Sequence, residues 1–104
     1  MNPAKPLSPT IAVVIPCFRV REAILGVLEA IGPVCQAIYV VDDACPENTG
    51  DLVESECRDP RVQVVRNPVN QGVGGATIAG YLAALEDGAE ILVKLDGDGQ
   101  MDPA

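Results

Sequence analysis

Acidic and amide side chains near the end of the chain have types and a spacing suited to metal binding. Asp96 and Asp98 stand one residue apart in "KLDGDGQMDP", directly after the apolar run "AEILV", and Gln100 continues the same spacing. The intervening Gly97 lets the backbone curl, so that both carboxylates can turn toward one point. A set made only of oxygen ligands suits Mg²⁺ or Mn²⁺. The segment therefore predicts a divalent-metal site at Asp96, Asp98 and Gln100.

Two other interpretations of this segment stay open at the level of sequence. An isolated D-x-D pattern is also typical of an acidic turn whose carboxylates cap backbone amides. A calcium loop has the same ligand spacing, but it requires Gly where Met101 stands and a closing Glu that does not follow. A cation is favoured because the formal net charge is −8, and adjacent carboxylates without a counter-ion repel one another.

A second acidic pair, Asp42-Asp43, ends the apolar run "AIYVV". These carboxylates could accept hydrogen bonds from a base N–H or a ribose hydroxyl, or they could only cap the end of a strand. The segment "GVGG" begins like the dinucleotide pattern G-x-G-x-x-G, but Thr77 stands in place of the last glycine and the segment follows the third strand. A tight turn with close helix packing is the favoured interpretation of these glycines.

The elements that must position these residues follow from hydrophobic periodicity. Four apolar runs alternate with three helical patterns, which is typical of an α/β fold: a Rossmann-like parallel sheet with helices on both faces and right-handed crossovers. The predicted strands are residues 10–16, 37–41, 62–65 and 90–95, and the predicted helices are residues 20–31, part of 45–57, and 70–88. We expect residues 1–9 to form a proline-rich arm and residues 10–104 to form one domain.

The last helix carries apolar residues that we expect to face the sheet. Gly88 fits the C-terminal cap of this helix. The expected apolar face consists of Thr77, Ile78, Tyr81, Leu82 and Leu85.

In a parallel sheet of this kind, ligands bind at the edge formed by the carboxyl ends of the strands. Three unusual clusters should meet there: Pro16 to Arg19, Asp42-Asp43, and the acidic segment from Asp96 to Gln100.

Composition excludes several classes of function. Seven basic residues against fifteen acidic ones cannot form a patch for nucleic acid. No run approaches the roughly 20 apolar residues of a membrane span, and the first residues do not resemble a signal peptide. The four cysteines contain no C-x-x-C pair and the chain has no His, which argues against zinc. We expect the cysteines to be reduced thiols in a cytoplasmic protein.

Four segments in order and spacing resemble the family 2 glycosyltransferases of the GT-A fold. They are "IPCFR", "VVDDACPENTGD", "NPVNQGVGGATIAGY" and "VKLDGDGQMDP", and the resemblance covers residues 10–103. Within that family the chain is similar to the polyprenyl-phosphate sugar transferases, such as dolichol-phosphate mannose synthase. The fold implied by the resemblance is the nucleotide-binding half of a GT-A enzyme, and the implied motif at Asp96 to Asp98 is the DXD motif.

The resemblance implies a role for each cluster. Pro16 and Phe18 would border the nucleotide base, Asp43 would bind it, and Asp42 would support the loop. Arg19 and Gly72 belong to the same donor-binding set. The metal at Asp96, Asp98 and Gln100 would bridge the donor diphosphate, with Asp96 shared between donor and metal.

The chain departs from the family pattern at several positions. Arg19 replaces the usual Asn, Val20 stands near a usual acidic residue, and Val73 and Ala79 occupy places where many members carry Lys or Arg. Neutralisation of phosphate would then fall on Arg19, Arg21 or Arg66, or wholly on the metal.

The implied activity is metal-dependent, inverting transfer of a sugar from a nucleoside-diphosphate sugar to an acceptor, either a polyprenyl phosphate or a glycan. The family fold continues beyond residue 104, so we expect the acceptor site and general base to lie outside this chain. We expect the chain alone to be inactive and to self-associate, and the full-length protein to associate with the inner face of the membrane. The alternative function is a non-catalytic nucleotide- or metal-binding module. A phospho-acceptor receiver domain would need an Asp after the third strand, and "VQVVRNP" has none.

Overall fold

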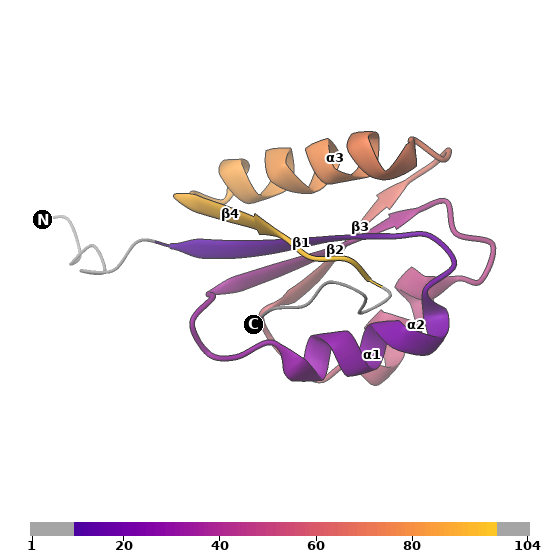
Figure 1. Cartoon of the computed structure of the whole chain (residues 1–104), viewed down its shortest axis with the longest axis horizontal. Helices are drawn as coiled ribbons and strands as arrows, with labels where there is room; N and C mark the ends of the chain where they lie inside the picture. The colour runs from indigo at the N-terminus through magenta and orange to yellow at the C-terminus, as the bar shows by residue number, and fades with distance from the viewer. Residues whose placement is uncertain (1–9, 98–104) are drawn as a thin grey trace, which may run out of the picture.

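The computed structural model describes residues 10–97, in which three helices cover a four-stranded parallel sheet (Figure 1). The predicted alternation of strands and helices and the Rossmann-like α/β class are confirmed. The elements are β1 (Ile11–Cys17), α1 (Arg21–Ala30), β2 (Ala37–Asp43), α2 (Thr49–Glu56), β3 (Val62–Asn67), α3 (Gly72–Glu86) and β4 (Ile91–Lys94).

The order of strands across the sheet is β3-β2-β1-β4, and every neighbouring pair is parallel. The register places Cys17 of β1 beside Asp42 of β2, and Asp42 beside Arg66 of β3. β4 extends the sheet on the other side of β1, and Leu95 continues the pairing by donating its N–H to the Val14 carbonyl at 3.0 Å. The carboxyl ends of the strands therefore meet at one edge, as the sequence predicts.

The face of the sheet covered by α1 and α2 is packed with large branched side chains. Strand residues such as Ile15 and Ile38 meet Ile24 and Leu28 of α1 and Val53 of α2, and all five are almost fully buried. The two helices lie on this face, and α3 lies alone on the opposite face (Figure 1). Beta-branched strands and the i, i+4 spacing on α1 produce this core directly.

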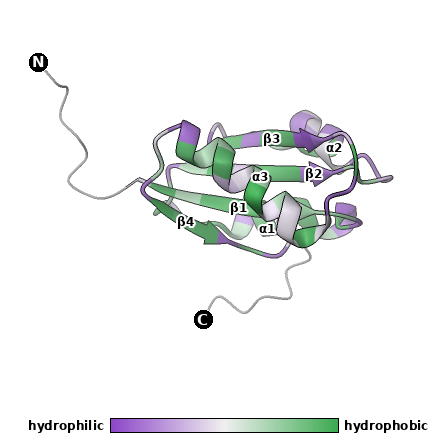
Figure 2. Cartoon of the chain, turned by 90° about the horizontal axis from the view of Figure 1, so that it is seen from above, coloured by the Kyte–Doolittle hydropathy of each residue, from purple (hydrophilic) through white to green (hydrophobic). Residues whose placement is uncertain are grey.

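The face covered by α3 is packed differently, and the predicted apolar face is wrong for three of its five residues, Ile78, Leu82 and Leu85. The helix turns Ala76, Gly80 and Ala84 toward the sheet. Figure 2 shows hydrophobic positions recurring along α3 where it overlies the sheet. The side chains of Ile78, Leu82 and Leu85 are 59%, 62% and 55% exposed, whereas Thr77 and Tyr81 are half-buried.

Two features explain the orientation of α3. The helix is apolar on all sides, so its periodicity does not single out one face. Gly80 also lies against β1, where a Cβ atom would come within 2.3 Å of Val14 Cγ1. Only small residues allow the helix to approach the sheet this closely. The helix ends at Glu86, and Gly88 closes its C-terminus as predicted: it has φ 91° and donates its N–H to the Leu85 carbonyl at 3.0 Å.

The helices between residues 10 and 97 are all too short or too polar to cross a bilayer.

Candidate functional site

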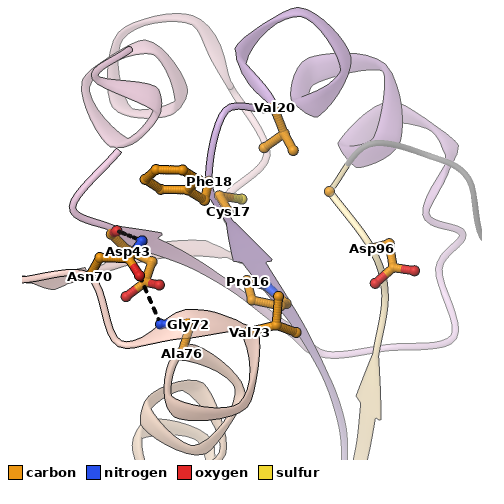
Figure 3. Close-up of a pocket in the computed structure, with 11 residues that line it drawn as sticks. Pro16, Cys17, Phe18, Val20, Asp43, Asn70, Gly72, Val73, Ala76 and Asp96 are labelled. Atoms are coloured by element: carbon orange, nitrogen blue, oxygen red, sulfur yellow. Dashed lines mark hydrogen bonds between the residues drawn. The ribbon is translucent and has the colours of Figure 1, made fainter. Parts of the chain in front are cut away.

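A pocket of about 330 Å³ lies at the carboxyl edge of the sheet (Figure 3). Its walls come from the end of β1, the end of β2, the segment leading into α3, and the segment after β4. The predicted residues Pro16, Phe18, Asp43, Gly72 and Asp96 all line it, whereas Arg19 and Asp42 do not. The complete lining is Pro16, Cys17, Phe18, Val20, Asp43, Asn70, Gly72, Val73, Ala76, Asp96 and Gly97.

Asp43 is the buried carboxylate of this pocket, with a relative exposure of 2%. Its Oδ1 atom accepts hydrogen bonds from Asn67 Nδ2 at 2.9 Å and from the Gln71 N–H at 2.8 Å. Both donors bind the same oxygen, so within residues 10–97 Oδ2 has no hydrogen-bonding partner. Asp43 also has no Lys or Arg within ion-pair distance among those residues. No buried side-chain oxygen or nitrogen among residues 10–97 lacks a hydrogen-bonding partner, so Oδ2 reaches the surface of the pocket, where it can accept a hydrogen bond from a ligand N–H or O–H group.

The segment that leads into α3 holds Asp43 in position. Asn70 donates from Nδ2 to the Asp43 carbonyl at 3.1 Å, and its Oδ1 accepts the Gly72 N–H at 3.0 Å. Gly72 has φ 76°, a left-handed conformation that favours glycine. The turn at Gly72 thus brings the first residues of α3 against the pocket, as the favoured interpretation of "GVGG" requires.

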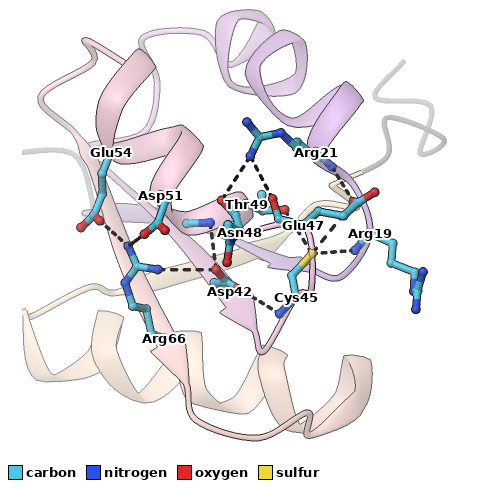
Figure 4. Close-up of polar contacts among 11 residues, drawn as sticks. Arg19, Arg21, Asp42, Cys45, Glu47, Asn48, Thr49, Asp51, Glu54 and Arg66 are labelled. Carbon is cyan, nitrogen blue, oxygen red and sulfur yellow. Dashed lines mark hydrogen bonds and ion pairs between the residues drawn. The ribbon is translucent and has the colours of Figure 1, made fainter.

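Asp42 has a different role from its neighbour, although it is almost equally buried. Its Oδ1 accepts the Cys45 N–H and its Oδ2 accepts the Gly50 N–H, both at 2.9 Å. Arg66 Nη1 approaches Oδ2 at 3.6 Å (Figure 4). Both oxygens are therefore used to hold the loop after β2 and the first turn of α2. The carboxylate stabilises the scaffold behind the pocket.

Arg21 and Arg66, two of the candidate phosphate ligands, are bound elsewhere. Arg66 is paired with Asp42, Asp51 and Glu54. Arg21 Nη1 donates to the Glu47 carbonyl at 2.9 Å and approaches the Asn48 carbonyl at 3.4 Å. These contacts tie α1 and β3 to the loop around α2, and neither guanidinium lines the pocket.

The third candidate phosphate ligand, Arg19, directly follows a pocket-lining residue, Phe18. Its guanidinium carbon lies 5.2 Å from the centroid of the Phe18 ring, in the range of a cation–π contact. Its backbone has φ 57°, and its N–H donates to Cys45 Sγ at 3.2 Å. Figure 4 shows its side chain turned away from the carboxylates around Arg66.

The metal-site prediction is only partly within the described residues. Asp96 stands on the pocket wall opposite Asp43, with Pro16 and Val73 between them (Figure 3). Its side chain is 41% exposed, and Oδ1 lies 3.3 Å from Lys94 Nζ. Asp98 and Gln100 lie outside residues 10–97, a range in which no three His, Cys, Asp or Glu side chains form a metal-binding group.

The residue present at this wall fits a hard divalent cation. Asp96 offers an oxygen ligand at the pocket, with part of its carboxylate open to solvent. Gly97 itself lies close to the end of β1, because a Cβ there would meet Val20 Cγ2 at 3.0 Å and Cys17 Sγ at 3.4 Å.

Cys17 lines the pocket and Cys45 does not, and burial and hydrogen bonds shift the pKa values of the two thiols in opposite directions. Burial, with a smaller effect of the Asp42 charge, raises the pKa of Cys17 to about 12. Burial also acts to raise the pKa of Cys45, but hydrogen bonds from the Thr49 hydroxyl and the Arg19 N–H outweigh it and lower that pKa. All four cysteines of the chain are free thiols, and Cys17 and Cys45 act here as packing and hydrogen-bonding residues.

Several lining residues are absent from the sequence prediction. Asn70 orders the entrance to α3, and Val20, Val73 and Ala76 provide apolar wall. Asn67 and Gln71, which bind Asp43, were not predicted either. The available signal was the run of side-chain amides after β3, since this strand ends at the same edge as β1 and β2.

Comparisons with known sequences identify a family and two similar proteins. The profile described as "Glycosyl transferase family 2" matches residues 12–104. The chain is 43% identical over 67 residues to an undecaprenyl-phosphate mannosyltransferase of Micrococcus luteus, covering 64% of this chain and 28% of that protein. It is 35% identical over 95 residues to the polyprenol monophosphomannose synthase of Mycolicibacterium smegmatis, covering 88% of this chain and 36% of that protein. The chain thus spans about a third of the length of these relatives.

Solved structures share the fold. A mannosyltransferase from Pyrobaculum calidifontis, PcManGT in complex with GDP-Man and Mn²⁺, superposes with a TM-score of 0.74 at 22% identity, covering 95% of this chain and 30% of that one. TarS of S. aureus in complex with UDP-GlcNAc superposes with a TM-score of 0.63 at 21% identity, covering 86% of this chain and 26% of that one. At these identities the likeness supports the GT-A architecture.

Proposed function

The chain belongs to glycosyl transferase family 2, and on that premise we propose that its pocket binds the nucleoside part of a nucleoside-diphosphate sugar. The proposed reaction of the whole protein is transfer of a mannosyl group from GDP-mannose to a polyprenyl phosphate. The names of two relatives, an undecaprenyl-phosphate mannosyltransferase and a polyprenol monophosphomannose synthase, support the mannosyl group and the polyprenyl acceptor. The donor is suggested by PcManGT, whose structure holds GDP-Man. Because such an acceptor is a lipid, the whole protein would act at a membrane surface.

The observation that carries the proposal is the open oxygen of Asp43. This buried carboxylate has Oδ1 occupied by Asn67 and Gln71, while Oδ2 is free, among the described residues, to accept a hydrogen bond from a base. Pro16 and Phe18 supply apolar surface beside it. A volume of about 330 Å³ is at the small end for a ligand pocket and suits a nucleoside better than a complete nucleotide sugar. The phosphates and the sugar would then extend toward Asp96.

Asp96, Asp98 and Gln100 would hold Mg²⁺ or Mn²⁺ beside the diphosphate. When bound, the cation supplies Lewis acidity and offsets charge on the departing nucleoside diphosphate. Asp43 and Asp42 have separate duties in this proposal, because Asp43 binds the base while Asp42 keeps the loop behind it in place. We propose inversion at the sugar carbon, and we assign no general base and no acceptor site within residues 10–97.

The test is nucleotide binding by an Asp43→Asn variant. The new side chain has a single oxygen, which Asn67 and Gln71 already require, so its NH₂ group would face the N–H donor of the base. Two opposed donors should lower the affinity for GDP at least about tenfold, since a buried polar group is left unpaired. Asp51→Asn is the matched control, because it makes the same chemical change on an exposed residue outside the pocket lining.

Calorimetric titrations with GDP and UDP, each with and without Mn²⁺, measure these effects. We expect Mn²⁺ to strengthen binding by wild type and by Asp51→Asn. Undiminished nucleotide affinity in Asp43→Asn would remove the basis of the proposal.

A further inference from the structure

The basic side chains of the chain are few, and most are already paired. All Lys and Arg residues except Lys5 lie within residues 10–97. Arg58 follows α2 and precedes β3, so it lies at the end of the sheet opposite the pocket. Four others are bound to carboxylate or carbonyl oxygens: Arg21, Arg61, Arg66 and Lys94. Within the described part of the chain, this leaves Arg19 as the cation near the pocket without an oxygen partner.

Arg19 is placed to reach the rim of the pocket. It directly follows Phe18, whose ring lines the pocket and lies under the guanidinium at 5.2 Å. The side chain is exposed, and an exposed cation–π contact is weak enough to be exchanged for a better partner. The arrangement keeps a positive charge near the pocket, and no carboxylate among the described residues pairs with that charge.

The backbone of Arg19 adds an independent observation. Its φ of 57° lies in the left-handed region, which is disfavoured for residues with a Cβ atom and is adopted more readily by Gly and Asn. In this conformation the Arg19 N–H donates to Cys45 Sγ at 3.2 Å. An arginine held in an unfavourable backbone conformation directly after a pocket-lining residue points to a use of its side chain.

Electrostatics indicate what that use is. The pocket wall carries the carboxylates of Asp43 and Asp96, and the chain has a formal net charge of −8. A phosphate group entering this site is repelled unless a cation stands close to it. A guanidinium also presents a planar fork of N–H donors that matches phosphate oxygens.

We therefore propose that Arg19 binds a phosphate group of a substrate at this pocket. The group is either the diphosphate of the donor or the monophosphate of a lipid acceptor, which present the same chemistry to a guanidinium. This inference rests on the proposed function, and it assigns to Arg19 the charge compensation that no other described basic residue is free to give.

The most informative variant is Arg19→Asn, because it removes the positive charge while keeping a residue that tolerates the left-handed backbone conformation. Asn is better suited to a left-handed backbone, so the unfolding temperature should stay the same or rise. The affinity for a phosphate-containing ligand should nevertheless fall about tenfold or more, as expected for loss of a charge-assisted hydrogen bond. Arg19→Lys should recover part of that affinity. Arg58→Gln is the control for removing one positive charge at the far end of the sheet.

The probes are GDP, guanosine and farnesyl phosphate, titrated in Mn²⁺ into wild type and each variant. Weaker binding of GDP with unchanged binding of guanosine assigns Arg19 to the donor diphosphate. Weaker binding of farnesyl phosphate alone assigns it to the acceptor phosphate. Equal affinities of wild type and Arg19→Asn for both phosphate probes would overturn the inference, while Asp43 could still bind guanosine. If wild type bound none of the probes, the proposed function would fail as well.

Discussion

The two faces of the sheet are built on the same central strands but are packed in opposite ways. On the face of α1 and α2, helix residues such as Ile24 and Leu28 fill space between large strand side chains. On the face of α3, the helix residues that are fully buried are all small, with Tyr81 half-buried beside them, and most of the volume comes from strand residues such as Val14 and Tyr39. On the face of α1 and α2, large helix side chains fill the core. On the face of α3, the core is completed because the helix lies close to the sheet.

The difference has a consequence for the pocket. Because α3 lies close to the sheet, its first turn comes within reach of the end of β2. There the Gln71 N–H binds Asp43 Oδ1, and Val73 and Ala76 form part of the pocket wall. The close packing of α3 against the sheet therefore also orients Asp43, the candidate base-binding carboxylate. Substitutions on this face should disturb the site as well as the fold.

The largest expected effect comes from adding a single methyl group to α3. In an open helix position, Gly→Ala stabilises a protein by up to about 1 kcal/mol. Gly80→Ala should instead lower the free energy of unfolding by about 1–3 kcal/mol, the usual cost of overpacking a core. The new Cβ would lie 2.3 Å from Val14 Cγ1 and 3.0 Å from Val41 Cγ2. Urea denaturation followed by circular dichroism measures the change.

Gly74→Ala is the matched control on the same helix, since a Cβ at Gly74 has no neighbour within 4 Å. We expect this variant to be as stable as wild type or more stable. If both alanine variants stabilised the protein, the close contact between α3 and β1 would be wrong.

A smaller effect is expected at the other end of α3, where Tyr39 is anchored. The buried Tyr39 hydroxyl donates to Asp87 Oδ2 at 2.6 Å, linking β2 to the residue that follows the helix. Tyr39→Phe keeps the ring and removes the bond, so it should cost about 1 kcal/mol, the usual net value of one hydrogen bond. Asp87 is exposed and can bind water instead. Denaturation at neutral pH tests this value.

The same bond gives the α3 face a pH dependence at high pH. Burial, aided by the hydrogen bond to Asp87, raises the pKa of Tyr39 from 10.0 to about 12. The protonated phenol is thus favoured by folding. Its contribution to stability is fully present below pH 10 and is lost as the pH rises toward 12. Between these values the stability of wild type should fall more steeply than that of Tyr39→Phe, and parallel curves would contradict the assignment.

The sequence predicts the strands well because they are continuous beta-branched runs, and it predicts the location of the site because parallel strands end at one edge. Asp43 and Asp96 could be placed at that edge by this reasoning alone. The separate roles of Asp42 and Asp43 came from the family resemblance and stay a prediction, and the structure shows that the two carboxylates have different hydrogen-bonding partners.

Other features could not be predicted because they depend on tertiary register. Arg66 is paired with Asp42 because β2 and β3 align these positions, and the sequence does not specify that alignment. The orientation of α3 could not be predicted because the helix is apolar on every side. The sequence signal for the buried face was the set of three small residues spaced four apart, because small residues allow the helix to lie close to the sheet.

The smallest expected effect on stability is on the outer side of α3, where a substitution tests whether the large apolar residues of this helix lie outside the core. Leu82 is 62% exposed, so Leu82→Gln should change the free energy of unfolding by no more than about 0.5 kcal/mol. Ile78, Leu82 and Leu85 nevertheless form an apolar stripe at i, i+4 and i+7, and contiguous exposed apolar surface promotes association. We expect wild type to self-associate with rising concentration in sedimentation velocity, and Leu82→Gln to do so less. A loss of more than about 1 kcal/mol in dilute, monomeric protein would instead mean that Leu82 belongs to the core, since losses of that size come from buried positions.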